Sequence, residues 1–197
     1  MPHSPSSTKK VDGRRLRSDR SRQIIVQSML QLINEGNLAP TAQQIANHAK
    51  VGIRSVFRHF EDMEAIFATA DQLWREGFIG KTSSVDPELP VLQRIRWAVT
   101  ELQTLFEGNS CLLKSTAIRR WRSTFLQQNY AKIQSRMRAD IERALPEIGP
   151  LSSSRQEAIF ALMSFEYWDR LRDHQSLSSD DSANLLVEVL ESLISPA

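Results

Sequence analysis

TAQQIANHAKVGIRSVFRHF, residues 41–60, is the stretch of this sequence that decides its fold. It contains two short helical patterns separated by a tight turn, and the second pattern is basic. Thr41 and Gln44 have the spacing of a capping box, in which each side chain accepts a hydrogen bond from the other residue's backbone amide, so we expect a helix to begin at Thr41. Helices this short are not stable alone, so both are expected to pack on the helix that precedes them.

That preceding helix is predicted from Ser18 by apolar residues at helical spacing, and Asn34 and Gly36 mark its end. The three helices are expected to share one apolar core. The residues predicted in that core are Ile25, Met29, Leu32, Ile45, Ala46, Ala49, Val56 and Phe60. Between the two short helices, either Lys50 or Gly52 must take the special turn conformation, and the sequence leaves both open.

The rest of the chain also has helical patterns. Asp62 is expected to cap a helix over 63–80, which connects the first three helices to the remainder. Its apolar stripe consists of Ile66, Phe67, Ala70, Leu73 and Trp74. Further helices are expected over 91–107, 110–120, 123–145, 154–172 and 179–194. No segment alternates apolar and polar residues with a period of two, so we predict an all-α fold without a sheet.

Basic residues are concentrated in the first third of the chain. Residues 1–60 contain ten Lys and Arg against three Asp and Glu, whereas the remainder has more acidic than basic residues. This asymmetry favours a polyanion-binding module joined to a part that does not touch the polyanion. A basic arm over 1–17, which we interpret as disordered, explains only part of the excess, because Arg54 and Arg58 lie in the helical motif.

Two helices joined by a tight turn, the second of them basic, form the helix-turn-helix pattern. In that arrangement the second helix enters the major groove of DNA, and the first braces it on the backbone. The alternative interpretation of the same residues is a basic helix face that is merely solvated.

The same stretch resembles the N-terminal domain of TetR-type transcriptional regulators. The positions that match the family pattern are Thr41, Ile45, Ala46, Ala49, Val51, Phe57, Arg58, His59 and Phe60, followed by the MEAIF of 63–67. The resemblance implies a DNA-binding transcriptional regulator that acts as a homodimer on a pseudo-palindromic operator. It further implies a repressor, which a small-molecule effector releases from the DNA. Three positions depart from the family: Lys50 stands where glycine is usual, Phe57 where tyrosine is common, and Met63 where lysine is common.

The predicted organisation follows from these patterns and the resemblance. It comprises a disordered basic arm over 1–17, a helix-turn-helix DNA-binding domain over 18–62 with its motif at 41–60, a connecting helix over 63–80, and a larger helical ligand-binding and dimerisation domain over 81–197.

DNA-binding side chains are expected from the arm, the start of the first motif helix and the second motif helix. Arg54 and Ser55 are predicted to face base edges, and the polar and basic residues around them to contact mainly phosphates. Arg17 is expected to reach the backbone or the minor groove. The full set is Arg17, Thr41, Gln43, Gln44, Ile53, Arg54, Ser55, Phe57, Arg58 and His59.

The second half of the chain yields two further predictions. Aromatic residues at helical spacing usually form a core, but the family resemblance implies a pocket among them for a small apolar or aromatic effector. The candidate pocket residues are Trp74, Trp97, Phe106, Trp121, Phe125, Met137, Phe160 and Met163. The last two helices have more apolar surface than one subunit needs, so we expect a two-fold four-helix dimer interface. The candidate interface residues are Ile159, Leu162, Met163, Leu186, Val187, Leu190 and Leu193.

An enzyme finds little support in the sequence. No HExxH, paired CxxC, Walker or GxGxxG motif occurs, and we expect neither a metal nor a cofactor. A single cysteine, Cys111, and the lack of a membrane-length apolar run predict a cytoplasmic protein without membrane contact. The competing hypothesis is an all-helical RNA- or protein-binding module without operator specificity or a small-molecule switch. The effector, the operator, the regulated genes, and the choice between repressor and activator are not readable from the sequence.

Overall fold

The computed structural model describes residues 13–78 and 84–194, with side chains described for 16–73 and 84–194. The described residues form helices, turns and loops without a strand, so the all-α prediction is confirmed. The chain divides into two compact units, Met1–Gly77 and Phe78–Ala197. No helix in the described ranges is long and apolar enough to span a bilayer.

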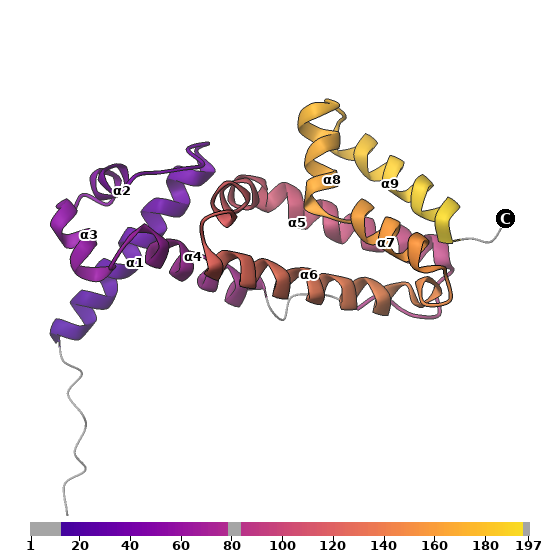
Figure 1. Ribbon diagram of the computed structural model, residues 1–197, viewed down its shortest axis with the longest axis horizontal. Helices are drawn as coiled ribbons and strands as arrows, with labels where there is room; N and C mark the ends of the chain where they lie inside the picture. The colour runs from indigo at the N-terminus through magenta and orange to yellow at the C-terminus, as the bar shows by residue number, and fades with distance from the viewer. Residues whose placement is uncertain (1–12, 79–83, 195–197) are drawn as a thin grey trace, which may run out of the picture. The chain divides into compact units, whose positions relative to one another are not determined.

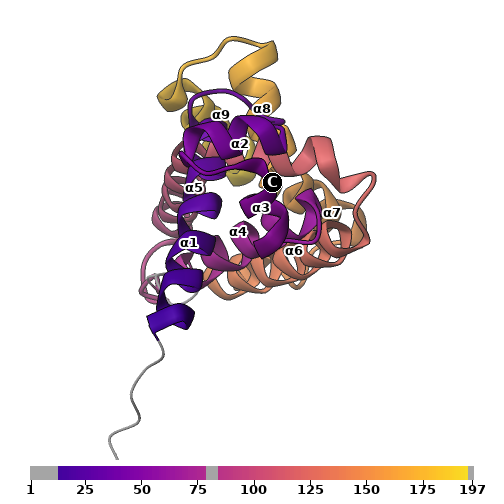
Figure 2. The same ribbon diagram turned by 90° about the vertical axis from the view of Figure 1, so that its left-hand side faces the viewer.

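The described part of the first unit contains four helices. They are α1 Gly13–Asn34, α2 Ala42–His48, α3 Ile53–His59 and α4 Met63–Phe78. Figures 1 and 2 show α1, α2 and α3 side by side, each in contact with the other two. Because α1 begins at Gly13 and not at Ser18, part of the expected disordered arm is helical. The remainder of that arm, 1–12, lies outside the described residues.

The core of the first unit matches the predicted set with small changes. Six of the predicted residues are buried: Ile25, Met29, Ile45, Ala46, Val56 and Phe60. Leu32 and Ala49 are only partly buried. The core is completed by Val26 and Ile33 of α1 and by three residues of the α4 stripe, Ile66, Phe67 and Ala70. Leu73, further along that stripe, is exposed, and the side chains of 74–78 lie outside the described residues.

The turn between α2 and α3 depends on Lys50. Its φ is 54°, and its amide donates to Asn47 O at 3.2 Å while the Val51 amide donates to Ala46 O at 3.0 Å. This is the Schellman pattern, the same that Gly36, with φ of 95°, uses to end α1. Gly52 is extended, with φ −70° and ψ 145°, and begins α3. Lys50 therefore takes the left-handed conformation that the sequence alone did not assign.

We expect Lys50→Gly to raise the free energy of unfolding by about 1 kcal/mol, because glycine removes the Cβ strain of a positive φ. Gly36→Ala should lower it by about the same amount for the converse reason. Lys50→Ala is the matched control, since it removes the side-chain charge but keeps the Cβ at the positive φ. Urea denaturation followed by circular dichroism measures all three, and an unchanged midpoint for Lys50→Gly would contradict the strain argument.

Between residues 84 and 194, the second unit contains five helices, a 3₁₀ turn and one turn of π-helix. They are α5 Val91–Arg120, α6 Thr124–Ala144, the 3₁₀ turn Pro146–Ile148, α7 Ser153–Leu162, α8 Phe165–Asp169, the π-helical turn Arg170–His174 and α9 Ser179–Ile194. Helix α5 packs against α6, α8 and α9, and α7 packs against α8 and α9 (Figure 1).

One predicted helix end is absent. The helix expected over 91–107 runs on to Arg120, through the Gly108–Asn109 pair that was expected to stop it. An interior glycine costs only about 1 kcal/mol, which burial on both sides of it can offset. Phe106 and Ser115 are both buried, and the Asn109 side chain donates to Leu105 O at 2.7 Å, within the helix.

A predicted single helix is broken in two. The helix expected over 154–172 stops at Leu162, and Ser164 begins α8 in an extended conformation. The Ser164 Oγ accepts from the Tyr167 amide at 3.3 Å and donates to Ala161 O at 2.6 Å. A serine that serves both helix ends in this way favours the break. The break directs Met163 and Trp168 into one core.

The core of the second unit is closed at one end by a buried arginine. Arg94 of α5, only 6% exposed, donates to Leu89 O and to Ala144 O, both at 3.0 Å, and pairs with the carboxylate of Glu147. The hydrogen bond from Arg94 holds the pKa of Glu147 below its usual value. This pair fixes the end of α6 against the start of α5.

Candidate nucleic-acid interface

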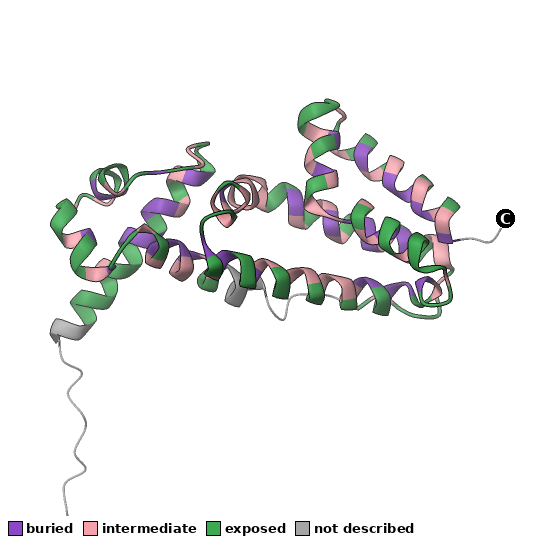
Figure 3. Ribbon diagram, viewed as in Figure 1, coloured by how far each residue is buried: buried purple, intermediate pink, exposed green. Residues whose placement is uncertain are grey.

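Helix α3 has one face in the core and one face exposed. Val56 is fully buried, whereas Ile53, Arg54, Phe57 and Arg58 are exposed. The four-residue spacing places Ile53 and Phe57 in one row and the two arginines in the row beside it. We call these the apolar row (Ile53, Phe57) and the basic row (Arg54, Arg58). Figure 3 shows much of α3 in the colour of exposed residues.

The position of α3 depends on Arg22 of α1. Its guanidinium donates to the backbone carbonyl of His59 at 3.2 Å and to Thr69 Oγ1 of α4 at 3.1 Å. It also lies over the Phe60 ring, 4.4 Å from the centroid. One side chain therefore joins α1, the end of α3 and α4. Sequence reasoning missed this residue, because nothing local distinguishes Arg22 from other arginines of α1.

The start of α2 has the predicted capping box. The Thr41 amide donates to Gln44 Oε1 at 2.8 Å, and the Gln44 amide donates to Thr41 Oγ1 at 3.3 Å. The side chain of Gln43, the residue before Gln44, donates to Asn47 Oδ1 at 2.8 Å. All three predicted residues are exposed, so a ligand could reach them. Their contact with phosphate stays a prediction.

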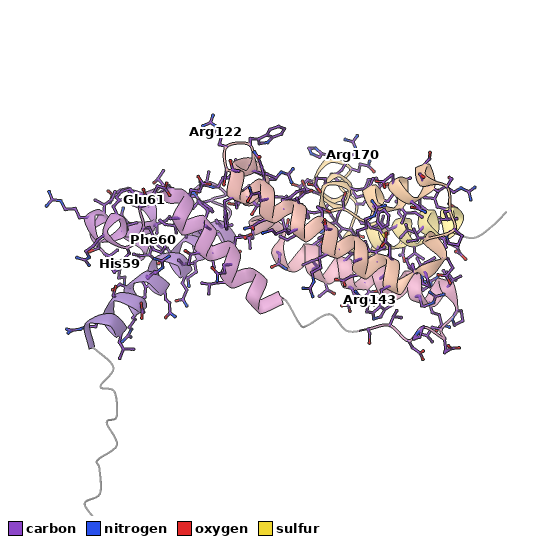
Figure 4. All side chains as sticks on the ribbon, turned by 60° about the horizontal axis from the view of Figure 1, so that its bottom comes forward. His59, Phe60, Glu61, Arg122, Arg143 and Arg170 are labelled. Atoms are coloured by element: carbon purple, nitrogen blue, oxygen red, sulfur yellow. The ribbon has the colours of Figure 1, made fainter. Side chains whose placement is uncertain are left out.

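Three of the predicted DNA-binding residues meet around one pocket. Arg17 of α1 and Arg58 and His59 of α3 line a pocket of about 240 Å³ together with Ser18 and Ser21. His59 Nε2 is buried and has no hydrogen-bond partner among the described residues. His59 lies at the end of α3 beside Phe60, where Figure 4 labels both. Sequence reasoning missed Ser18 and Ser21, since isolated serines on an exposed helix carry no signal.

The charges of this pocket suit an oxyanion. Burial lowers the pKa of His59, and the nearby Arg58 and Arg22 charges lower it further, so the imidazole is neutral at pH 7. Two guanidinium groups, the Ser18 hydroxyl and an imidazole are donors that phosphate-binding sites use, whereas the Ser21 hydroxyl already donates to Arg17 O at 3.0 Å. The pocket we call the anion pocket (Arg17, Ser18, Ser21, Arg58, His59) is therefore a candidate site for a phosphate group.

The predicted dimer-interface residues lie mainly inside the second unit. Five of them are buried in its core: Ile159, Met163, Leu186, Val187 and Leu190. Their own chain already covers these side chains, so they leave little surface for a partner. Leu162 and Leu193 are partly buried. Periodicity does not say which of the two apolar stripes of α9 faces inward, and the subunit interface stays a prediction.

The described members of the predicted effector pocket lie in different environments. Trp121 is 82% exposed, and Phe106 packs in the core, its ring centroid 5.5 Å from that of Phe165. Trp97 and Phe125 are partly buried, and the side chain of Trp74 lies outside the described residues. The structure does bring together three of the predicted residues. Met137, Phe160 and Met163 line a pocket of about 230 Å³, with Gln134, Ser135, Arg138 and Ile141.

Comparison with known proteins adds no assignment. No family model matches this chain, and no curated protein matches it. Within the described ranges, no group of three His, Cys, Asp or Glu residues is placed to hold a metal ion. The function must therefore be argued from the site itself.

We expect sulfate to raise the pKa of His59, because an anion in the pocket stabilises the imidazolium. NMR titration of the His59 ring protons with and without sulfate measures the shift. Arg58→Ala should reduce the sulfate effect, whereas Arg170→Ala, which removes an exposed arginine of the second unit, is the control and should leave it unchanged. An equal sulfate effect in the Arg58 variant and the wild type would contradict a built anion site.

Proposed function

We propose that this protein is a sequence-specific DNA-binding transcriptional regulator of the TetR type. The observation that carries the proposal is the meeting of Arg17, Arg58 and His59 around one pocket beside the exposed face of α3. Like charges repel and separate in water. Packing of α1 on α3 brings two arginines and a histidine together, and a phosphate ligand would offset the repulsion between the two arginines.

The arrangement of the first unit supports α3 as the reading helix of a helix-turn-helix domain. The major groove is about 12 Å wide and admits one α-helix. The exposed Arg54 can donate two hydrogen bonds to O6 and N7 of a guanine. The anion pocket at the other end of α3 would hold a backbone phosphate, which fixes the register of the helix along the duplex. The exposed start of α2 would contact the backbone next to it.

We also propose that the regulator is a homodimer, through a surface that shares only Leu193 with the predicted set. On α9 the buried stripe is Leu186, Leu190 and Ile194, whereas Leu185, Val189 and Leu193 form a second stripe that is only partly buried. We call this the outer stripe of α9. A second apolar stripe that its own chain leaves partly open favours a partner helix. A two-fold axis there would pair two reading helices on a pseudo-palindromic operator.

The effector that the family resemblance implies would occupy the pocket of Met137, Phe160 and Met163. Its volume of about 230 Å³ suits only a small compound. Arg138 borders it, held over the Phe160 ring at 3.9 Å and paired with Glu157 at 2.8 Å. An apolar or aromatic compound that displaced this arginine would bind the pocket. The test is whether such a compound releases the protein from the selected operator.

Selection from a random duplex library should enrich one sequence. Arg54→Ala should then cost about 1–3 kcal/mol on that duplex and relax specificity at one position. Arg58→Ala should weaken binding to all sequences and reduce the slope of log K against log salt by about one. Arg170→Ala removes the same charge from an exposed position of the second unit and is the matched control. An RNA- or protein-binding module without operator specificity would enrich no duplex.

The double variant Leu185→Asp, Val189→Asp should give folded monomers that bind the operator weakly, because it charges the outer stripe. The double variant Leu186→Asp, Leu190→Asp should instead unfold the second unit, since burying a carboxylate costs several kcal/mol against a total stability of roughly 5–15 kcal/mol. Sedimentation and circular dichroism distinguish the two results. A dimer that survives the first pair of changes would show that the outer stripe is not the interface.

A further inference from the structure

Two large apolar side chains are exposed on the short helix α3. Ile53 is 36% exposed and Phe57 48% exposed, on a helix of seven residues. They form the apolar row, parallel to the basic row of Arg54 and Arg58. Both rows consist of exposed residues and belong to the face that α3 turns away from the core. Figure 3 draws much of α3 in the colour of exposed residues.

The fold of the first unit does not account for the apolar row. Val56 and Phe60, which are 0% and 2% exposed, already supply the contribution of this segment to the core. An exposed phenylalanine adds little to stability, because its ring stays largely in water. A ligand that covers the row would remove that apolar area from water. The adjoining arginines indicate that the ligand is an anion with apolar groups close to its polar ones.

Duplex DNA offers this combination in its major groove. The C5 methyl of thymine is the apolar group on the base edges there, and guanine O6 and N7 are the acceptors that arginine reads. The apolar row lies beside the basic row, because Ile53 is next to Arg54 in the sequence. The two rows would therefore contact neighbouring bases. A protein partner would match the apolar row but would need an acidic surface for the basic row and for the anion pocket.

We propose that Ile53 and Phe57 contact thymine methyl groups, so that each half-site of the operator carries thymine beside the guanine read by Arg54. This inference rests on the proposed function, because it names the kind of sequence that the same helix reads. According to this inference, the apolar row contributes a preference for thymine, which hydrogen bonding alone would not supply. Phenylalanine at position 57 is suited to it, since the ring has no hydroxyl to direct toward phosphate.

The test removes the methyl groups without changing the hydrogen bonds. Duplexes selected by the wild-type protein are prepared with one thymine at a time replaced by deoxyuridine, and dissociation constants are measured by fluorescence anisotropy at fixed salt. Loss of each contacted methyl should lower the affinity roughly fourfold, because that is the effect of no longer burying one such carbon. We expect this loss at one or two thymines of each half-site and no change at the others.

Protein variants identify the side chains. Phe57→Ala should bind the thymine duplex and the deoxyuridine duplex with equal affinity when the replaced thymine is the one that Phe57 contacts. Ile53→Ala should do the same for the neighbouring thymine, which Ile53 contacts. Arg58→Ala should weaken binding to the thymine and deoxyuridine duplexes by the same factor, so the preference for thymine should remain. Ile118→Ala, at an isoleucine of the second unit that is 54% exposed, is the matched control and should behave as wild type. Thermal melts establish that each variant is folded.

The outcomes separate this inference from the proposed function. Enrichment of a duplex with no thymine-to-deoxyuridine difference at any position overturns the methyl contacts and leaves the DNA-binding regulator standing. Discrimination that persists unchanged in both the Phe57 and Ile53 variants also overturns the inference, and leaves the apolar row to a protein partner. Failure to enrich any duplex overturns the proposed function and this inference with it.

Discussion

Seven residues are too few for a helix to be stable in water, and α2 and α3 each have seven. Everything that α3 presents to solvent therefore depends on what holds it from behind. Burial of Val56 and Phe60 supplies the apolar part of that support, and Arg22 supplies the polar part through its hydrogen bonds to His59 O and Thr69. The rows on the exposed face are positioned only because these contacts exist.

Arg22 also links the support of α3 to the electrostatics of the anion pocket. The same guanidinium that accompanies Phe60 adds, after burial and Arg58, to the lowering of the His59 pKa. A neutral imidazole beside Arg17 and Arg58 limits the repulsion within the empty pocket. An arriving anion would reverse the balance and favour the protonated form, so occupation of the pocket and proton uptake are linked.

Local patterns predicted the elements well where the responsible contacts lie within one turn of helix. The capping box of Thr41 and Gln44, the stop at Gly36, and the Asp62 cap, whose carboxylate accepts from the Ala65 amide at 2.8 Å, involve residues at most a few positions apart. The same kind of reasoning failed at Gly108, where packing on both sides outweighs a weak helix breaker. It also failed at Ser164, where one hydroxyl serves two helices.

The sequence by itself determined the all-α class, the start of α2, most of the first core, and which basic residues α3 exposes, because helical period and capping are local properties. Tertiary structure alone decided which stripe of α9 faces inward, since two stripes of similar apolarity compete and only the neighbouring helices choose. It also placed Arg17 beside His59, a meeting that requires α1 and α3 to pack. Lys50 rather than Gly52 took the positive φ because Gly52 had to be extended to begin α3, and burial of Val56 fixes where α3 begins.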